Sequence, residues 1–142
     1  MKDCVICQAI QNPDHSPYDV VFEDDFVITG LANEWEVKGH TSVALKQHDI
    51  VNVSDLSEED YLKFSRYVHK TEGVLLDVLK QNKSLILKSG GLCPHFHFHI
   101  YPIQNDKPFL EIIDMITMKN RYNPTEDEKK EFIETLRKRL AE

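Results

Sequence analysis

The chain has 142 residues, of which 41% are hydrophobic and 29% are charged, with only 5 glycines and 6 prolines. This composition predicts one ordinary globular domain over residues 1–142 and excludes a disordered, collagen-like or low-complexity chain. The formal net charge of −7 argues against a nucleic acid polymer as partner, because the field of the protein repels a polyanion, but it permits a small phosphate ligand in one pocket.

The N-terminal region carries no targeting signal that we recognise. The first seven residues, MKDCVIC, lack the apolar core of a signal peptide, and no apolar run approaches the about 20 residues of a membrane span. We therefore expect a cytoplasmic protein that does not enter a membrane. In a reducing compartment, the close pair Cys4 and Cys7 points to metal or redox chemistry rather than to a disulfide framework.

The first half of the chain predicts a loop, a hairpin and a further strand. Residues 12–17 contain two prolines and predict a loop. The β-prone runs 20–22 and 26–28 are joined by the acidic residues 23–25, which predicts a hairpin. Residues 41–46 form the third strand candidate.

A long helix follows, and then two strands and two helices. Ser57 has the position of an N-cap before three acidic residues, and apolar residues recur at helical spacing over 57–80. Residues 85–87 and 95–101 are strand candidates, and residues 109–118 are interpreted as a short helix. Thr125 and Glu128 form a capping box for a final helix over about 125–141. This order predicts an α+β fold in which an antiparallel sheet packs against the long helix.

The segment His95-Phe96-His97-Phe98-His99-Ile100 is the most informative stretch. Because side chains alternate along a strand, the three imidazoles are expected on one face and the apolar residues on the other. Three shielded imidazoles in a row indicate phosphate chemistry, metal binding or both. Two alternatives remain open from the residues alone: an exposed strand face without a function, and a metal face like that of histidine–carboxylate oxygenases.

The histidine segment resembles the signature of the histidine triad (HIT) superfamily of nucleotide hydrolases and transferases, and the resemblance covers roughly residues 4–102. Supporting segments occur in the same order, namely Val21-Phe22-Glu23-Asp24, Lys38-Gly39-His40, Lys46-Gln47-His48 and Asp55-Leu56-Ser57. The resemblance implies a HIT-like fold, a homodimer and a nucleotide or nucleoside phosphate as substrate. It also implies that His97 attacks the α-phosphate, that His99 steadies the transferred phosphate or leaving group, and that His40 orients the triad. The alternative for His40 is a turn residue that starts a strand.

The Cys4/Cys7 pair is one half of a zinc site, which needs two further ligands. Similarity to zinc-containing HIT proteins and to galactose-1-phosphate uridylyltransferases implies the set Cys4, Cys7, His48 and His95. Four protein ligands would make a closed, structural zinc site. A redox pair and a metal-free pair of buried cysteines remain as alternatives, and Cys93 is expected to serve packing only.

The chain departs from the family pattern around the expected phosphate and ribose contacts. Gly91 and Leu92 stand where the family has Gln and a hydroxyl residue, and Ala32 stands where it has an acidic residue or Asn. The nearest substitutes define the candidate substrate-binding residues Asn33, Glu34, Lys88 and Gly91. We therefore expect the phosphate chemistry to be retained with an altered substrate.

Overall fold

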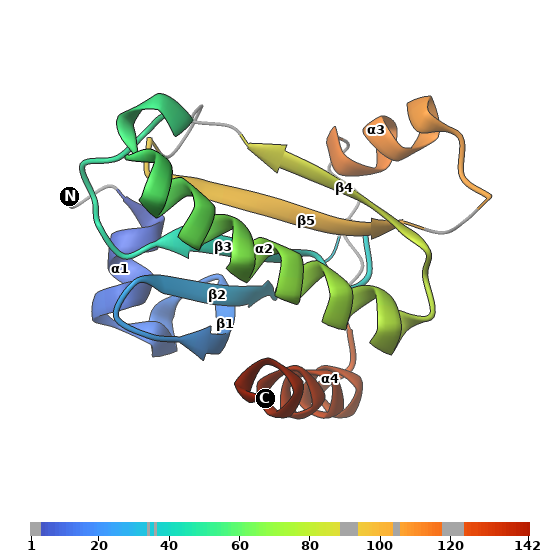
Figure 1. The fold of residues 1–142 in the computed structure, drawn as a ribbon. Coiled ribbons are helices and arrows are strands. Elements are labelled where there is room, and N and C mark those ends of the chain that lie inside the picture. Colours follow the sequence, from blue (N-terminus) through green and yellow to red (C-terminus); the bar gives the residue numbers. More distant parts are fainter. Residues whose placement is uncertain (1–3, 34, 36, 89–93, 104–105, 118–123) are drawn as a thin grey trace.

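The computed structural model describes residues 4–33, 35, 37–88, 94–103, 106–117 and 124–142 (Figure 1). Five strands form its centre, and four α-helices surround them. The strands are β1 (Tyr18–Glu23), β2 (Val27–Ala32), β3 (Thr41–Leu45), β4 (Lys83–Lys88) and β5 (His97–Ile103). The helices are α1 (Val5–Gln11), α2 (Glu58–Leu79), α3 (Phe109–Thr117) and α4 (Glu126–Ala141), with short 3-10 turns at Pro13–His15 and Val53–Asp55.

The strands form one antiparallel sheet in the order β1-β2-β3-β5-β4. The predicted hairpin is present, and its turn is closed by Asp24, whose Oδ1 accepts hydrogen bonds from the backbone amides of Phe26 and Val27 at 2.8 and 2.9 Å. Strand β5 lies between β3 and β4 and is therefore an inner strand, which restricts the side chains along it. The predicted α+β fold with an antiparallel sheet is confirmed.

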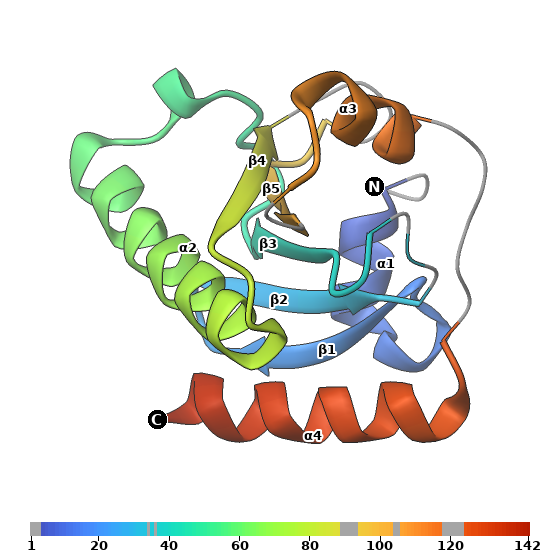
Figure 2. The same cartoon turned by 90° about the vertical axis from the view of Figure 1, so that its right-hand side faces the viewer.

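Helix α2 covers one face of the sheet, while α1 and α3 lie on the opposite side (Figure 2). The N-cap interaction of α2 is present, because Ser57 Oγ accepts a hydrogen bond from the amide of Asp60 at 3.1 Å. The apolar side of the histidine segment packs beneath this helix, with the Phe64 ring 4.9 Å from that of Phe96 and 5.2 Å from that of Phe98. The prediction of a core between the long helix and the apolar residues of this segment is therefore confirmed.

Helix α4 covers the β1 edge of the sheet (Figures 1 and 2). Its N-cap forms as predicted, with Thr125 Oγ1 accepting from the amide of Glu128 at 3.2 Å. At the irregularity in β1, Arg137 donates from Nε and Nη2 to the carbonyl of Val20 at 3.0 and 2.9 Å. These bonds satisfy an acceptor that an edge strand would otherwise expose to a second chain.

Three local features differ from what the sequence predicts. No element is predicted for residues 5–11, which form α1 directly after Cys4, whose sulfur caps the helix. The expected loop 12–17 contains a 3-10 turn at Pro13–His15. Strand β5 begins at His97 and not at His95, so His95 does not belong to the alternating strand. Within the described ranges, no helix combines the length and apolarity needed to cross a bilayer.

Candidate functional site

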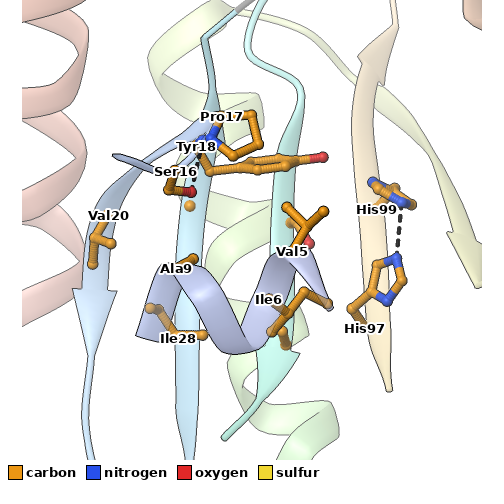
Figure 3. A pocket seen from close by; sticks show the side chains of 13 residues that line it. Val5, Ile6, Ala9, Ser16, Pro17, Tyr18, Val20, Ile28, His97 and His99 are labelled. Carbon is orange, nitrogen blue, oxygen red and sulfur yellow. Dashed lines mark hydrogen bonds between the residues drawn. The ribbon is translucent and has the colours of Figure 1, made fainter. Parts of the chain in front are cut away.

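A pocket of about 430 Å³ lies on the face of the sheet that is opposite α2 (Figure 3). Two rows of directly paired residues make its floor, and such pairs share a face of the sheet. One row runs from Gly30 through Ser42 to His99, and the other from Ile28 through Ala44 to His97. Because Gly30, Ser42 and Ala44 have small side chains, they leave space above the sheet beside the imidazoles.

Of the residues that line this pocket, the sequence predicts only His97 and His99 as site residues. Its further lining residues are Val5, Ile6, Ala9, Ser16, Pro17, Tyr18 and Val20. The apolar spacing of residues 5, 6 and 9 was the available signal for α1, but the segment is only 7 residues long, too short for periodicity to identify. Gly30 is needed beneath Tyr18, since a Cβ at this position would lie 2.8 Å from the Tyr18 Cβ.

Three histidines form a continuous row at the pocket wall. His97 Nε2 lies 3.1 Å from His99 Nε2, and His99 Nδ1 lies 2.9 Å from His40 Nε2. At the far end of the row, His97 Nδ1 donates to the carbonyl oxygen of His95 at 2.5 Å. The structure thus brings together all three residues that the sequence singles out for catalysis.

The carbonyl at one end assigns the protons along the row. A carbonyl oxygen only accepts, so the proton of neutral His97 is on Nδ1 and its Nε2 carries the lone pair. His99 Nε2 must then donate to His97, which leaves the lone pair of His99 on Nδ1, where His40 Nε2 donates. The row is therefore directional: His40 donates to His99, His99 donates to His97 Nε2, and His97 donates from Nδ1 to the carbonyl of His95.

Burial keeps these imidazoles neutral. Desolvation lowers the pKa of His40 to about 4. Desolvation, and then the neighbouring His40 and His97, lower the pKa of His99 to about 3. The pKa of His97 is also lowered, chiefly by desolvation and against the opposing effect of its bond to His95. An unprotonated His97 is the form that can attack an electrophile.

Two tyrosines hold the ring of His40. Tyr101 stacks on it with ring centroids 4.2 Å apart and an interplanar angle of 15°, while Tyr18 meets it edge-on at 6.0 Å. His40 is 3% exposed, so its ring has little freedom to turn away from His99.

A second group of side chains gathers where β5 begins. The potential ligand atoms of Cys4, Cys7, His48 and His95 all lie within 4.8 Å of one another. Cys7 Sγ lies 3.0 Å from His48 Nδ1, and His95 Nδ1 lies 3.5 Å from both sulfurs and 3.4 Å from His48 Nδ1. The structure therefore assembles the four residues that the resemblance implied as a metal set.

The spacing within this Cys/His cluster fits a tetrahedral ion. Zinc bonds of about 2.3 Å to sulfur and about 2.0–2.1 Å to nitrogen place neighbouring ligand atoms about 3.3–3.8 Å apart, which most of the observed distances match. His95 Nε2 donates to the carbonyl of Leu45 at 2.6 Å, which leaves the lone pair on Nδ1, the atom that faces the two cysteines. Such a bond on the other ring nitrogen is typical of a metal-binding histidine.

The two predicted substrate-binding residues that the structure describes, Asn33 and Lys88, do not line the pocket. Asn33 is outside its lining, and its side-chain amide donates to the carbonyl of Ser16 at 3.2 Å. Lys88 pairs directly with Phe98, whose ring packs against α2, so Lys88 belongs to the face opposite the pocket. Glu34 and Gly91 lie outside the described residues.

Comparisons with known proteins find similarity to histidine triad proteins. It matches no protein-family model. An uncharacterized HIT-like protein of Methanocaldococcus jannaschii is 29% identical over 103 residues, which are 70% of this chain and 78% of that protein. A hypothetical histidine triad nucleotide-binding protein of Sulfolobus tokodaii has a similar fold, with a TM-score of 0.74, 20% identity, and coverage of 97% of this chain and 92% of the other.

A zinc-bound histidine triad family protein of Mycobacterium smegmatis also shares the fold, with a TM-score of 0.69, 23% identity, and coverage of 99% of this chain and 94% of the other. The sequence relatives, the shared fold and the His-x-His-x-His segment agree. In sequence and in fold, the chain is similar to proteins of the histidine triad (HIT) superfamily.

Proposed function

We propose that the protein is a nucleotidyl hydrolase or transferase that cleaves a nucleoside phosphate ester, anhydride or phosphoramidate at the α-phosphate. The observation that carries this proposal is the state of His97. Its Nδ1–H is fixed by the carbonyl of His95, its Nε2 lone pair accepts from His99 Nε2, and its side chain lines the pocket. The Sulfolobus tokodaii protein, whose fold this chain shares, is described as nucleotide-binding.

In the first step, His97 Nε2 attacks the α-phosphorus and the bond to the leaving group breaks. The leaving group takes up a proton, and a nucleotidyl-imidazole forms whose positive charge is offset by the bond from Nδ1–H to the His95 carbonyl. In the second step, water or another acceptor attacks phosphorus. The phosphorus–nitrogen bond then breaks, the acceptor loses its proton, and the lone pair of His97 Nε2 is restored.

We assign His99 and His40 supporting roles in this reaction. When a ligand fills the pocket, the Nε2–H of His99 is free to donate to a phosphate oxygen in place of His97. His40 keeps that proton on Nε2, because it donates to the other nitrogen of His99. The apolar part of the pocket, which includes Ile6, Val20 and Ile28, offers a surface for a nucleobase.

We further propose that the Cys/His cluster holds zinc. Bound there, zinc would supply structural cross-linking and no water activation, because four protein ligands complete its tetrahedron. The cysteine sulfurs must stay reduced for this role, which is consistent with the cytoplasmic location expected from the sequence. The homodimer implied by the resemblance stays a prediction, which light scattering on the purified protein would test.

The enzyme proposal is tested by turnover of a fluorogenic adenylyl-tryptamine or adenylyl-lysine substrate. We expect His97→Ala to lower the rate by about 10³-fold or more, since it removes the nucleophile. His69→Ala is the matched control, because His69 is an exposed histidine on α2, and it should react at the wild-type rate. Equal rates for wild type and His97→Ala would refute the proposal for this substrate class.

A zinc-stabilised nucleotide-binding protein with little turnover is the second candidate. One observation favours it: among the described residues, no side chain that lines the pocket carries a charge while its histidines are neutral. Phosphoryl transfer is normally assisted by positive groups that stabilise the transition state. Calorimetric binding of AMP by wild type and His97→Ala alike, without turnover in the fluorogenic assay, would establish this alternative.

A further inference from the structure

We propose that the metal cluster and the ligand pocket are thermodynamically coupled through helix α1, so that each site binds more tightly when the other is occupied. This inference rests on the proposed function, because it requires a ligand in the pocket. It adds a regulatory role to a cluster that otherwise serves only stability. Two structural connections carry it.

The first connection is α1 itself, which belongs to both sites. Cys4 caps the helix and Cys7 lies in its first turn, with the Cys7 amide donating to Cys4 Sγ at 3.5 Å. Val5, Ile6 and Ala9, which lie on the same short helix as Cys7, line the pocket (Figure 3). The two cysteines and the pocket wall therefore move as one short rigid body.

The pocket itself separates α1 from part of the sheet. The helix side chains line one side of a space of about 430 Å³, and Ile28, Gly30 and Ala44 line another. An apolar helix face that borders a cavity gains less packing energy than one seated on a core. We therefore expect the position of α1 to depend on what binds at its ends and on its inner face, namely the metal and the ligand.

The second connection is His95, whose side chain and backbone serve different sites. Its ring Nδ1 belongs to the cluster, while its carbonyl oxygen accepts a hydrogen bond from His97 Nδ1 at 2.5 Å. A metal that fixes the His95 ring also fixes this carbonyl, and with it the tautomer and ring plane of His97. The cluster therefore helps to position both α1, which forms one wall of the pocket, and His97, the proposed nucleophile.

Coupling of this kind is reciprocal, because a ligand that stabilises the metal-bound arrangement must itself be stabilised by the metal to the same extent. We expect a change of at least about fivefold in each affinity, at the lower end of typical couplings. AMP serves as the probe. Its dissociation constant is measured by calorimetry on zinc-loaded and chelator-treated protein, and zinc affinity is measured by competition with a chromophoric chelator with and without saturating AMP.

Two matched variants separate coupling through α1 from a general loss of folding. Ile6→Ala removes a wall residue and Ile10→Ala removes the same residue type one turn later in the same helix, outside the pocket lining. Both leave the four cluster residues in place. We expect AMP to raise zinc affinity in wild type and Ile10→Ala, and to do so much less in Ile6→Ala. The zinc competition begins from folded, loaded protein, so its result does not depend on a stable metal-free form.

The outcomes distinguish this inference from the proposed function. If AMP binds loaded protein and leaves zinc affinity unchanged, the coupling is wrong while nucleotide binding stands. If Ile6→Ala and Ile10→Ala respond alike, α1 does not carry the coupling. If AMP does not bind the loaded protein at all, nucleotide binding and the coupling both fail.

Discussion

His95 and His97 are two residues apart, yet they carry their lone pairs on opposite nitrogens. His95 donates from Nε2 to the carbonyl of Leu45 and presents Nδ1 to two cysteines. His97 donates from Nδ1 to the carbonyl of His95 and holds its Nε2 lone pair against His99 at the pocket wall. The comparison teaches that a backbone acceptor on one ring nitrogen decides which chemistry the other nitrogen performs.

The surroundings of the two histidines enforce this division. His95 precedes the strand and is 1% exposed, whereas His97 opens β5 and has the small residue Ala44 as its cross-strand partner. A structural metal site needs buried ligands such as His95, and an attacking imidazole such as His97 needs space beside it for the substrate. If the Cys/His cluster is structural and the histidine row is catalytic, substitutions in the two regions should affect different properties of the protein.

The largest effect is expected from removing the metal set. Cys4→Ser combined with Cys7→Ser should lower the zinc content from about one per chain to nearly none, and the midpoint of thermal unfolding should fall by about 5–15 °C. Metal analysis and calorimetry measure both quantities. Cys93→Ser is the control and should retain the metal; full zinc retention in the double variant would disprove the site.

Within the histidine row, His40 should matter through the hydrogen bond that it donates. His40→Leu removes the donor to His99 and should lower the turnover number by about 10–100-fold, as expected for one buried bond. His40→Gln offers an amide donor and should stay within about fivefold of wild type. Steady-state kinetics of both variants test this, with thermal unfolding as the control. Equal rate losses in the two variants would reduce His40 to a packing role.

The pH dependence of the free energy of unfolding should reveal the lowered pKa values of His40 and His99. Folding lowers the pKa of His40 to about 4 and that of His99 to about 3, against an unfolded value of about 6.5. As the pH falls below about 6.5, these two histidines become protonated in the unfolded chain but stay neutral in the folded chain. The free energy of unfolding therefore decreases. Above that pH both states are neutral and the contribution vanishes.

By pH 5.5 the expected loss is about 1 kcal/mol for each of these histidines. Urea titrations at pH 7.5, 6.5 and 5.5 in excess zinc measure it. The double variant His40→Gln/His99→Gln should lose less stability over this range than wild type. An identical pH dependence would mean that neither histidine is held neutral by the fold.

The smallest effect is expected at Lys88. Its cross-strand partner is Phe98, on the α2 face, and its charge reaches His97 only as a minor lowering of that pKa. Lys88→Met should therefore change KM for the fluorogenic substrate by less than about twofold, since solvent screens a charge at this range. A tenfold rise in KM would instead place this lysine at the ligand.

The sequence predicted long elements well and short ones poorly. The helix expected over 57–80 is observed at Glu58–Leu79, and the one expected over 125–141 is observed at Glu126–Ala141, because periodicity accumulates over many turns and caps mark the ends. Helix α1 was missed, since two turns give little periodic signal. The start of β5 was placed two residues early, because the His-x-His-x-His pattern continues past the point where His95 turns toward the cysteines.

What the sequence alone determined is the chemistry available: five histidines and two cysteines in an order that resembles the histidine triad pattern, and an apolar alternation that places His97 and His99 on one strand face. Only the tertiary structure decided which nitrogen of His95 and of His97 carries the lone pair. One of the acceptors that assign the protons is the carbonyl of Leu45, 50 residues away from His95 in sequence. The tertiary structure also decided that α1 forms a wall of the pocket. Contacts between distant segments set the pocket wall and the tautomer of His95, and the tautomer of His97 depends on how the backbone at His95 is folded.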